Sequence, residues 1–356
     1  MTATARVVRA LAATLVTAAA VATGLSTEPA AAATPPLPVY APHGTGGQPG
    51  EAADPGVVLD GGDFVAYSTG TLAPTARGDF ASGPWTSAGP SLTRLGAWSS
   101  GGGVWAPDAV HTSAGWVLYY AAAATGMGGQ RCIGIATSST ATGSFTPSDT
   151  PLVCPNAALG ADDTVPGRPV AGAGVIDPSP FQADDGTLYL LYKTQQTPSS
   201  LRMLTLRADG TRAGSGAVSK ELIQDSGIVE NPVMVQRGSH FVLLASRYGY
   251  DNCSYATQWW RSSSRWTFDA GASHSLMTTT DTGICGPGGA DLVPALDGGT
   301  RIFLHGWLCD LSTGAKACTS STITDHTHHR AMYVGVLGWG SDGATPQVSK
   351  FLNPGD

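Results

Sequence analysis

The stretch Asp177-Pro178-Ser179-Pro180-Phe181, followed by Asp185-Gly186-Thr187-Leu188-Tyr189-Leu190-Leu191-Tyr192-Lys193, decides the fold because its layout recurs along the chain. An acidic residue beside proline marks a turn, and the apolar run after it has the length and composition of a β-strand. Four further segments share this layout. In each, an acid lies a similar distance before the end of the apolar run, between 12 and 14 residues in three cases and 15 in the last. Their acids are Asp54, Asp108, Asp291 and Glu230.

The spacing of the five units predicts a β-propeller. Successive acids are 54, 69, 53 and 61 residues apart, which suits four strands and their turns in each repeat. No long stretch shows sustained helical periodicity. We therefore expect an all-β fold, a five-bladed β-propeller over residues 51–356 whose four-stranded antiparallel blades surround a central axis.

The composition agrees with one large β domain. The 356 residues include 47 Gly and 24 Pro, only 13% are charged, and 42% are hydrophobic, which describes a turn-rich chain with ample core. Single β domains reach this length.

The first 33 residues have the pattern of a secretory signal peptide. Arg6 and Arg9 precede an apolar run from Leu11 to Val21, and small residues at Ala30–Ala33 suit a cleavage site. The apolar run is shorter than the roughly 20 residues of a membrane-spanning helix. We expect a secreted, extracellular protein without a membrane segment, in which the Pro- and Gly-rich leader 34–50 lies on the domain or is disordered.

The charge of the chain excludes some partners. Removal of residues 1–33 takes away two arginines and one glutamate, so 19 − 2 = 17 basic and 26 − 1 = 25 acidic residues remain, a net charge of −8. Such a surface does not suit nucleic acid or anionic lipid. We expect a neutral ligand and a monomeric protein.

Six cysteines follow the signal segment, and an even number in an exported protein suggests disulfides. Of the 15 possible connectivities, successive pairing closes the smallest loops and is our prediction. The pairs would be Cys132–Cys154, Cys253–Cys285 and Cys309–Cys318. A zinc site would need close pairs such as C-x-x-C, which the sequence lacks.

The five acids suggest chemistry because equivalent positions of a propeller converge on its axis. Hydrolysis of a glycosidic bond needs one carboxylic acid to protonate the leaving oxygen and one carboxylate to activate water or attack carbon. A third acid nearby raises the pKa of the donor by like-charge repulsion. The competing interpretation is that acids beside proline only cap turns.

Several motifs, in this order, resemble those of glycoside hydrolase family 43, and the match covers nearly the whole chain after the leader. They are Asp54-Pro55-Gly56-Val57-Val58, Trp105-Ala106-Pro107-Asp108-Ala109-Val110, Ile176-Asp177-Pro178-Ser179-Pro180-Phe181, Val229-Glu230-Asn231-Pro232, Gly286-Pro287-Gly288-Gly289-Ala290-Asp291 and His305-Gly306-Trp307. This family consists of five-bladed propeller enzymes that act on arabinan, arabinoxylan and xylan fragments.

The resemblance implies an inverting mechanism and a role for each of three acids. Asp54 matches the general base that activates water, Glu230 the general acid, and Asp177 the residue that orients the donor and raises its pKa. Asp108 and Asp291 match positions usually read as structural.

Three further residues are candidates for contact with substrate. Trp105 and Phe181 could form apolar walls for a sugar ring, or be packed blade residues. His305 could bind substrate or a hydrated Ca²⁺, or be a satisfied core residue. We expect no metal ligand set and no required cofactor, since many family members have histidine where this chain has Gly289. A second departure is Asn231, where the family usually has a small residue.

The function expected from the sequence is that of a secreted hydrolase acting on pentose linkages of plant polysaccharides or oligosaccharides. An α-L-arabinofuranosidase is the first choice, and a β-xylosidase or endo-arabinanase is the alternative. A non-catalytic, carbohydrate-binding propeller is a further alternative. A retaining fructan hydrolase fits poorly, because its Asn-Asp-Pro-Asn and Glu-Cys motifs are absent.

Overall fold

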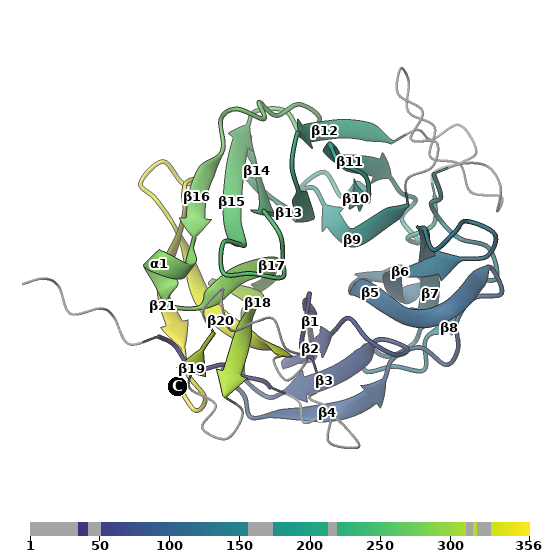
Figure 1. The fold of residues 1–356 in the computed structure, drawn as a ribbon, viewed down its shortest axis with the longest axis horizontal. Coiled ribbons are helices and arrows are strands. Elements are labelled where there is room, and N and C mark those ends of the chain that lie inside the picture. Colours follow the sequence, from purple (N-terminus) through teal and green to yellow (C-terminus); the bar gives the residue numbers. More distant parts are fainter. Residues whose placement is uncertain (1–34, 42–50, 156–173, 213–218, 311–315, 319–328) are drawn as a thin grey trace, which may run out of the picture. The chain divides into compact units, whose positions relative to one another are not determined.

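The computed structural model describes residues 35–41, 51–155, 174–212, 219–310, 316–318 and 329–356. Five antiparallel sheets surround a central axis, each built from strands that are consecutive in sequence (Figure 1). The predicted all-β five-bladed propeller is therefore confirmed.

The blades follow one another in chain order. Blade 1 contains β1 (Gly56–Asp60), β2 (Asp63–Tyr67), β3 (Pro74–Gly78) and β4 (Trp85–Pro90). Blade 2 contains β5 (Ser99–Thr112), β6 (Gly115–Ala124), β7 (Arg131–Ser138) and β8 (Thr146–Pro147). Blade 3 contains β9 (Val175–Gln182), β10 (Leu188–Thr194), β11 (Ser199–Thr205) and β12 (Lys220–Asp225).

Blade 4 contains β13 (Val229–Arg237), β14 (His240–Arg247), β15 (Ala256–Ser262) and β16 (His274–Met277). The short helix α1 (Thr279–Thr282) leads to the last blade. Blade 5 contains β17 (Cys285–Pro294), β18 (Thr300–Asp310), β20 (His329–Trp339) and β21 (Pro346–Leu352), and β19 (Lys316–Ala317) pairs with β18.

Neighbouring blades share hydrophobic cores, which explains why the second strands are almost wholly apolar. All seven residues of β10 are buried, because both faces of the strand lie against other parts of the protein. Phe181 and Tyr189 of blade 3 pack with Phe241 and Trp260 of blade 4 in one such core. A strand buried on both faces reads as a continuous hydrophobic run.

The ring is closed by contacts between the start of the chain and blade 5. The backbone of Ala52 donates a hydrogen bond of 3.0 Å to Arg330 O, and Tyr40 forms a β-bridge with Met332. The backbone of Val57 in blade 1 donates to Asp291 Oδ2 in blade 5 at 2.7 Å. Residues 39–40 of the leader therefore lie on the propeller.

One residue at the start of every blade has a left-handed backbone. These residues are Asp54 (φ 49°), Ala106 (φ 41°), Asp177 (φ 56°), Asn231 (φ 48°) and Gly289 (φ 59°). Four of the five carry a side chain, for which this region is unfavourable. The repeated kink is the common reference point of the blades.

The repeat alone suggested that the five acids are equivalent, but alignment on this kink shows that they are not. Asp54 and Asp177 occupy the kink itself, and Glu230 precedes it by one residue. Asp108 and Asp291 follow it by two residues. The acids therefore point to different depths along the axis.

All three predicted disulfides are confirmed, namely Cys132–Cys154, Cys253–Cys285 and Cys309–Cys318. Within the part of the chain that the structure describes, no helix is long and apolar enough to span a membrane. The predicted signal peptide, residues 1–33, lies outside the described residues.

Candidate active site

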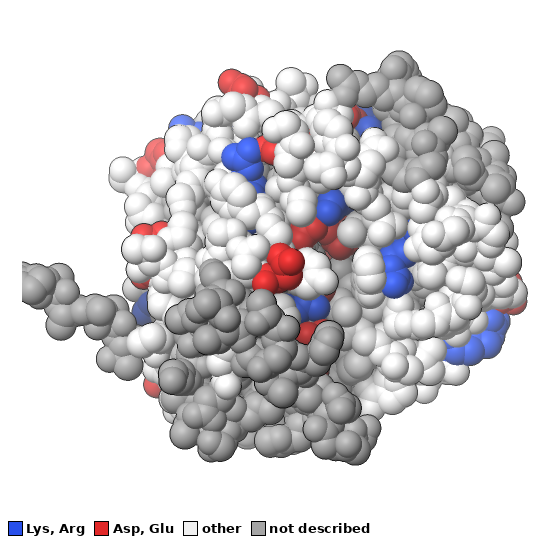
Figure 2. Space-filling model, viewed as in Figure 1, with Lys and Arg blue, Asp and Glu red and all other residues white. Residues whose placement is uncertain are grey.

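A pocket of about 390 Å³ opens at the axis of the propeller. Figure 2 shows acidic and basic side chains gathered around a hollow at the centre of this face. The three acids predicted to be catalytic all line this pocket, together with Trp105. The complete lining is Glu51, Asp54, Thr69, Trp105, Ile176, Asp177, Lys193, Gln195, Ile228, Glu230, Asn231, Tyr250 and Arg330.

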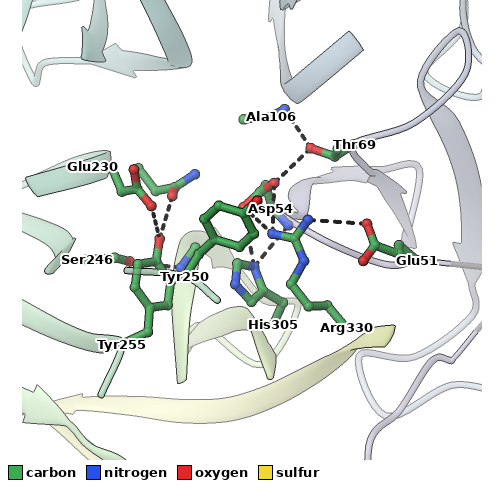
Figure 3. Close-up of polar contacts among 12 residues, drawn as sticks. Glu51, Asp54, Thr69, Ala106, Glu230, Ser246, Tyr250, Tyr255, His305 and Arg330 are labelled. Carbon is green, nitrogen blue, oxygen red and sulfur yellow. Dashed lines mark hydrogen bonds and ion pairs between the residues drawn. The ribbon is translucent and has the colours of Figure 1, made fainter. Parts of the chain in front are cut away.

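Asp54 is held by residues of three blades (Figure 3). Thr69 Oγ1 donates to its Oδ2 at 2.7 Å, and the Thr69 hydroxyl in turn accepts from the backbone of Ala106. The backbone of Asp54 donates to His305 Nδ1 at 3.0 Å. Burial opposes its ionised form, but the positive charge of Arg330 and other contacts outweigh burial and lower the pKa of Asp54. Asp54 is therefore a carboxylate at neutral pH.

Arg330 at the start of β20 links Asp54 to Glu51. Its Nη1 lies 3.5 Å from both Asp54 oxygens, and its Nη2 donates to Glu51 Oε2 at 3.2 Å (Figure 3). The guanidinium lies 5.0 Å from the centre of the Tyr250 ring. Neither Arg330 nor Glu51 was predicted from the sequence.

Glu230 at the start of β13 has a partner on each oxygen. Lys193 Nζ of β10 lies 2.6 Å from Oε2, and Tyr255 Oη donates to Oε1 at 2.9 Å. All three residues are buried. A carboxyl group held at both oxygens has a fixed orientation toward the pocket.

Asp177 lies beside Glu230 and connects blades 3 and 4. Its Oδ2 accepts a hydrogen bond of 3.0 Å from the backbone of Asn231. Burial and the neighbouring negative charge of Glu230 raise the pKa of Asp177 to about 7. The pocket therefore pairs an ionised acid, Asp54, with an acid that retains a proton near neutral pH.

Asp108 and Asp291 line a narrower cavity of about 30 Å³ rather than the pocket. Asp108 accepts from the backbone of Ala109, and Asp291 accepts from Val57 N and Leu292 N. Burial raises the pKa of both carboxyl groups, to about 7 for Asp291. These two acids bind backbone groups, in agreement with their expected structural role.

Phe181 does not line the pocket. It lies four residues beyond Asp177 on β9 and is only 4% exposed, with its ring stacked on Tyr189 in the core between blades 3 and 4. The prediction that Phe181 contacts a sugar is therefore wrong, because this part of β9 lies inside the blade packing.

His305 lies behind Asp54 and does not reach the pocket surface. It is fully buried, its ring stacks on Tyr255, and its Nδ1 accepts from Asp54 N. Burial lowers its pKa to about 3, so the imidazole is neutral and carries its proton on Nε2. The expected direct contact with substrate is corrected to a positioning contact with Asp54.

The residues around His305 do not fit a protein-built calcium site. Ca²⁺ takes six to eight oxygen ligands, whereas His305 offers only a ring nitrogen that carries a proton. Among the described residues, no group of three or more His, Cys, Asp or Glu side chains is placed to hold a metal ion. The described residues therefore provide no Ca²⁺ site built from protein oxygens, and the hydrated Ca²⁺ considered beside His305 stays a prediction.

The arrangement suits acid–base chemistry on a neutral ligand. An ionised carboxylate can accept a proton from water, while a protonated acid on the other side can protonate a leaving oxygen. The acids belong to blades 1, 3 and 4, so a sugar on the axis would have them around it.

Comparison with known proteins identifies the family. The model of the family described as "Glycosyl hydrolases family 43" matches residues 49–322, more than three quarters of the chain. No curated protein sequence matches this chain closely enough to count as a relative. Structural similarity, in contrast, is extensive.

Three solved structures illustrate that similarity. A thermostable family-43 glycoside hydrolase has a TM-score of 0.66 at 17% identity, covering 85% of this chain and 95% of that one. An endo-1,4-β-xylanase from Bacteroides thetaiotaomicron gives 0.64 at 17% identity, covering 90% and 98%. The α-L-arabinanase of Cellvibrio cellulosa, complexed with arabinohexaose, gives 0.63 at 17% identity, covering 85% and 96%.

At such low identity these structures establish the fold alone. The family match over most of the chain goes further, and it agrees with the order of the motifs along the sequence. This chain therefore belongs to glycosyl hydrolases family 43 and is a glycoside hydrolase.

Proposed function

We propose that the enzyme is a secreted, inverting α-L-arabinofuranosidase that acts on plant cell-wall polysaccharides or their oligosaccharides. Asp54 is the general base, Glu230 the general acid, and Asp177 the residue that controls the protonation of the donor. The observation that carries the proposal is the electrostatic difference between Asp54, which is ionised, and Asp177, whose pKa is about 7, at one pocket.

The proposed reaction uses the three acids and water. Asp54 takes a proton from a water molecule as the water oxygen attacks the anomeric carbon from one face. The bond to the leaving oxygen breaks on the other face, and the Glu230 proton moves to that oxygen. Direct displacement by water inverts the anomeric configuration.

Each acid is held for its part by its neighbours. Arg330 keeps Asp54 ionised, and the His305 ring holds the backbone of Asp54 in place. Lys193 and Tyr255 fix the Glu230 carboxyl group. Asp177 contacts the turn beside Glu230 through the backbone of Asn231, and the charge of Glu230 helps to raise the pKa of Asp177.

Arabinofuranosyl linkages are favoured over other pentose linkages on the strength of the neighbouring enzymes. The solved structures include arabinanases, one of them bound to arabinohexaose, and one exo-acting arabinanase. The same set includes an endo-xylanase, so a β-xylosidase or an endo-arabinanase is the alternative.

Turnover of three substrates tests the proposal. We expect residues 34–356 to hydrolyse an aryl α-L-arabinofuranoside faster than an aryl β-D-xyloside or linear arabinan, and to release the inverted sugar as followed by NMR. A faster xyloside reaction would select the β-xylosidase. Binding without release of product would select the non-catalytic alternative, and a retained anomer would overturn the roles of the acids.

The role of Glu230 is tested by its conversion to glutamine. Glu230→Gln should fold and lose turnover of substrates with poor leaving groups, since the amide has no acidic proton. Glu221→Gln, on the outer strand β12, is the matched control. Equal activity of the two variants would overturn the assignment of the general acid.

Export is tested separately. The full chain, expressed in a bacterium with a secretion system, should appear in the medium with a new N-terminus close to residue 34. A full-length chain retained in the cell would contradict the proposed signal peptide.

A further inference from the structure

Arg131 at the start of β7 is a half-buried cation beside the pocket. Its guanidinium lies over the Trp105 ring, 3.4 Å from the ring centre, and its Nη1 donates to Gly103 O at 3.0 Å. Its Nε is buried without a hydrogen-bond partner. Among the residues that the structure describes, no Asp or Glu forms an ion pair with Arg131.

An uncompensated guanidinium is costly in such a place. Removing a charge from water without a counter-charge is unfavourable, and burial lowers the pKa of Arg131 to about 10. Most other arginines of the described part have a carboxylate nearby. Arg94, Arg247, Arg265 and Arg330 are examples.

The position of Arg131 connects it with the pocket through two residues. Trp105 lines the pocket and is 39% exposed, although one face of its ring is covered by Arg131. Gln195 also lines the pocket, and its Oε1 accepts a hydrogen bond of 2.9 Å from the backbone of Arg131. The backbone of Arg131 is thereby anchored at the edge of the site.

Trp105 and Glu230 hold equivalent positions in their blades, each one residue before the kink. The aromatic wall and the proposed proton donor therefore face the pocket from two blades. A sugar unit that lies against Trp105 in the pocket is therefore next to the half-buried guanidinium of Arg131.

We propose that Arg131 and Trp105 form a subsite for a uronic acid unit, so that the enzyme prefers pentose-containing glycans that carry a carboxylate near the scissile bond. Arg131 binds the carboxylate, and Trp105 packs against the sugar ring. The planar fork of arginine matches a carboxylate better than a lysine ammonium does. This inference rests on the proposed function, because it names a preference among its substrates.

The competing interpretation is that Arg131 only supports Trp105 by a cation–π contact. The two interpretations differ in one measurable respect. A supporting residue affects acidic and neutral substrates alike, whereas a carboxylate ligand affects only the acidic one.

The test compares a glucuronic acid-bearing arabinoxylan oligosaccharide with the same compound after chemical reduction of its carboxyl group. We expect wild type to show a higher kcat/KM on the acidic compound, and Arg131→Met to lose about tenfold to a hundredfold on it, the range of one charge-assisted bidentate contact. Turnover of the reduced compound should change by less than about threefold, within the range of a lost exposed cation–π contact.

Arg237→Met is the matched control, since the Arg237 guanidinium also lies over a tryptophan ring, that of Trp339, at 4.6 Å and away from the pocket. It should leave both substrates unaffected. Equal losses on both compounds in Arg131→Met, or no preference of wild type for the acidic one, would overturn the proposed subsite.

A binding experiment tests this inference separately from the proposed function. Calorimetry with Glu230→Gln and the same two oligosaccharides measures affinity without turnover. Tighter binding of the acidic compound, lost when Arg131→Met is added, would support the subsite even if wild type hydrolysed neither compound. Equal affinity for the two would overturn it.

Discussion

Lys193 Nζ lies 2.6 Å from Glu230 Oε2, so the proposed proton donor is paired with a buried ammonium group. The two side chains come from neighbouring blades and are 7% and 12% exposed. The charge of Lys193 also acts on the other two acids, because it lowers the pKa of both Asp54 and Asp177. Lys193 therefore influences both the base and the acid side of the reaction.

Lys193→Met should move the whole pH profile of kcat/KM to higher pH, by about one unit. Loss of the positive charge raises the pKa of Asp54, so the acid limb moves up. Loss of the charge also raises the pKa of Asp177. The alkaline limb, on which Asp177 loses its proton, therefore moves to higher pH as well. Rates measured from pH 4 to 9 with an aryl arabinofuranoside give both limbs.

Lys193→Arg is the control, because it keeps the charge and should keep the limbs in place while lowering kcat through altered geometry. Since removal of one partner of a buried pair costs about 3–5 kcal/mol of stability, folding of each variant is checked by circular dichroism. A profile that loses amplitude without moving would assign Lys193 a packing role only.

Asp177→Asn should remove the limb of the profile that reflects a group with a pKa near 7. Burial and then Glu230 raise this pKa, so the wild-type rate should fall as the pH rises through about 7 and the acid pair loses its proton. The amide oxygen still accepts from the backbone of Asn231, so the blade contact survives. We expect kcat to fall by about 10² or more.

Asp108→Asn provides the comparison, because Asp108 is also a buried acid with a raised pKa but lines the narrower cavity and not the pocket. It should retain the limb near pH 7. An unchanged profile in Asp177→Asn would reduce Asp177 to a residue that caps the turn of blade 3.

Tyr255→Phe removes the hydroxyl group that contacts both Glu230 Oε1, at 2.9 Å, and Asn231 Oδ1, at 2.8 Å. The freed carboxyl group should rotate, so we expect kcat to fall about tenfold with little change in KM, because the contact orients the donor. The loss should be larger for substrates with poor leaving groups, which depend most on protonation.

Tyr119→Phe deletes a comparable buried hydroxyl, which donates to Gly210 O at 2.8 Å outside the pocket. Both variants should lose about 1 kcal/mol of stability, and only Tyr255→Phe should lose turnover. Parallel losses of activity would mean that general loosening, not orientation of Glu230, is responsible.

The sequence predicted the blades because each repeats a turn and an apolar strand, and it predicted the acids because they stand beside these turns. It did not predict Lys193, although this residue ends the stretch that decides the fold. A register shift between Leu191 and Lys193 accompanies its turn toward Glu230, and neither pattern nor composition reveals such a shift. Tyr255 and Arg330 lie far in the sequence from each of the five candidate acids.

The kink positions explain why the acids had to be separated by structure. The acid-turn-strand layout fits all five, but the acids two residues beyond the kink line the narrower cavity and not the pocket. Phe181 shows the same limit of sequence reasoning. It belongs to the motif that contains Asp177, but it lies four residues farther along β9 and packs in the core between blades 3 and 4.

Asp291→Asn should change the dependence of stability on pH without affecting turnover. Burial raises the pKa of Asp291 from 3.8 to about 7 in the folded protein. The folded state then binds the proton more tightly than the unfolded state, so this contribution to stability is complete below about pH 4 and is lost as the pH rises through about 7. Wild type should therefore become less stable over this window.

In Asp291→Asn the loss of stability with rising pH should be smaller, although Asp177 still contributes. The amide group cannot accept from both Val57 N and Leu292 N, so at pH 5 we expect the free energy of unfolding to fall by about 1–3 kcal/mol. Urea unfolding at pH 5, 6, 7 and 8 measures both effects. Asp297→Asn, an exposed acid paired with Arg301 beside the same strand, should leave the slope as in wild type. A steeper slope in Asp291→Asn, or a loss of kcat comparable to that of Asp177→Asn, would show that the narrower cavity takes part in the proton chemistry of the pocket.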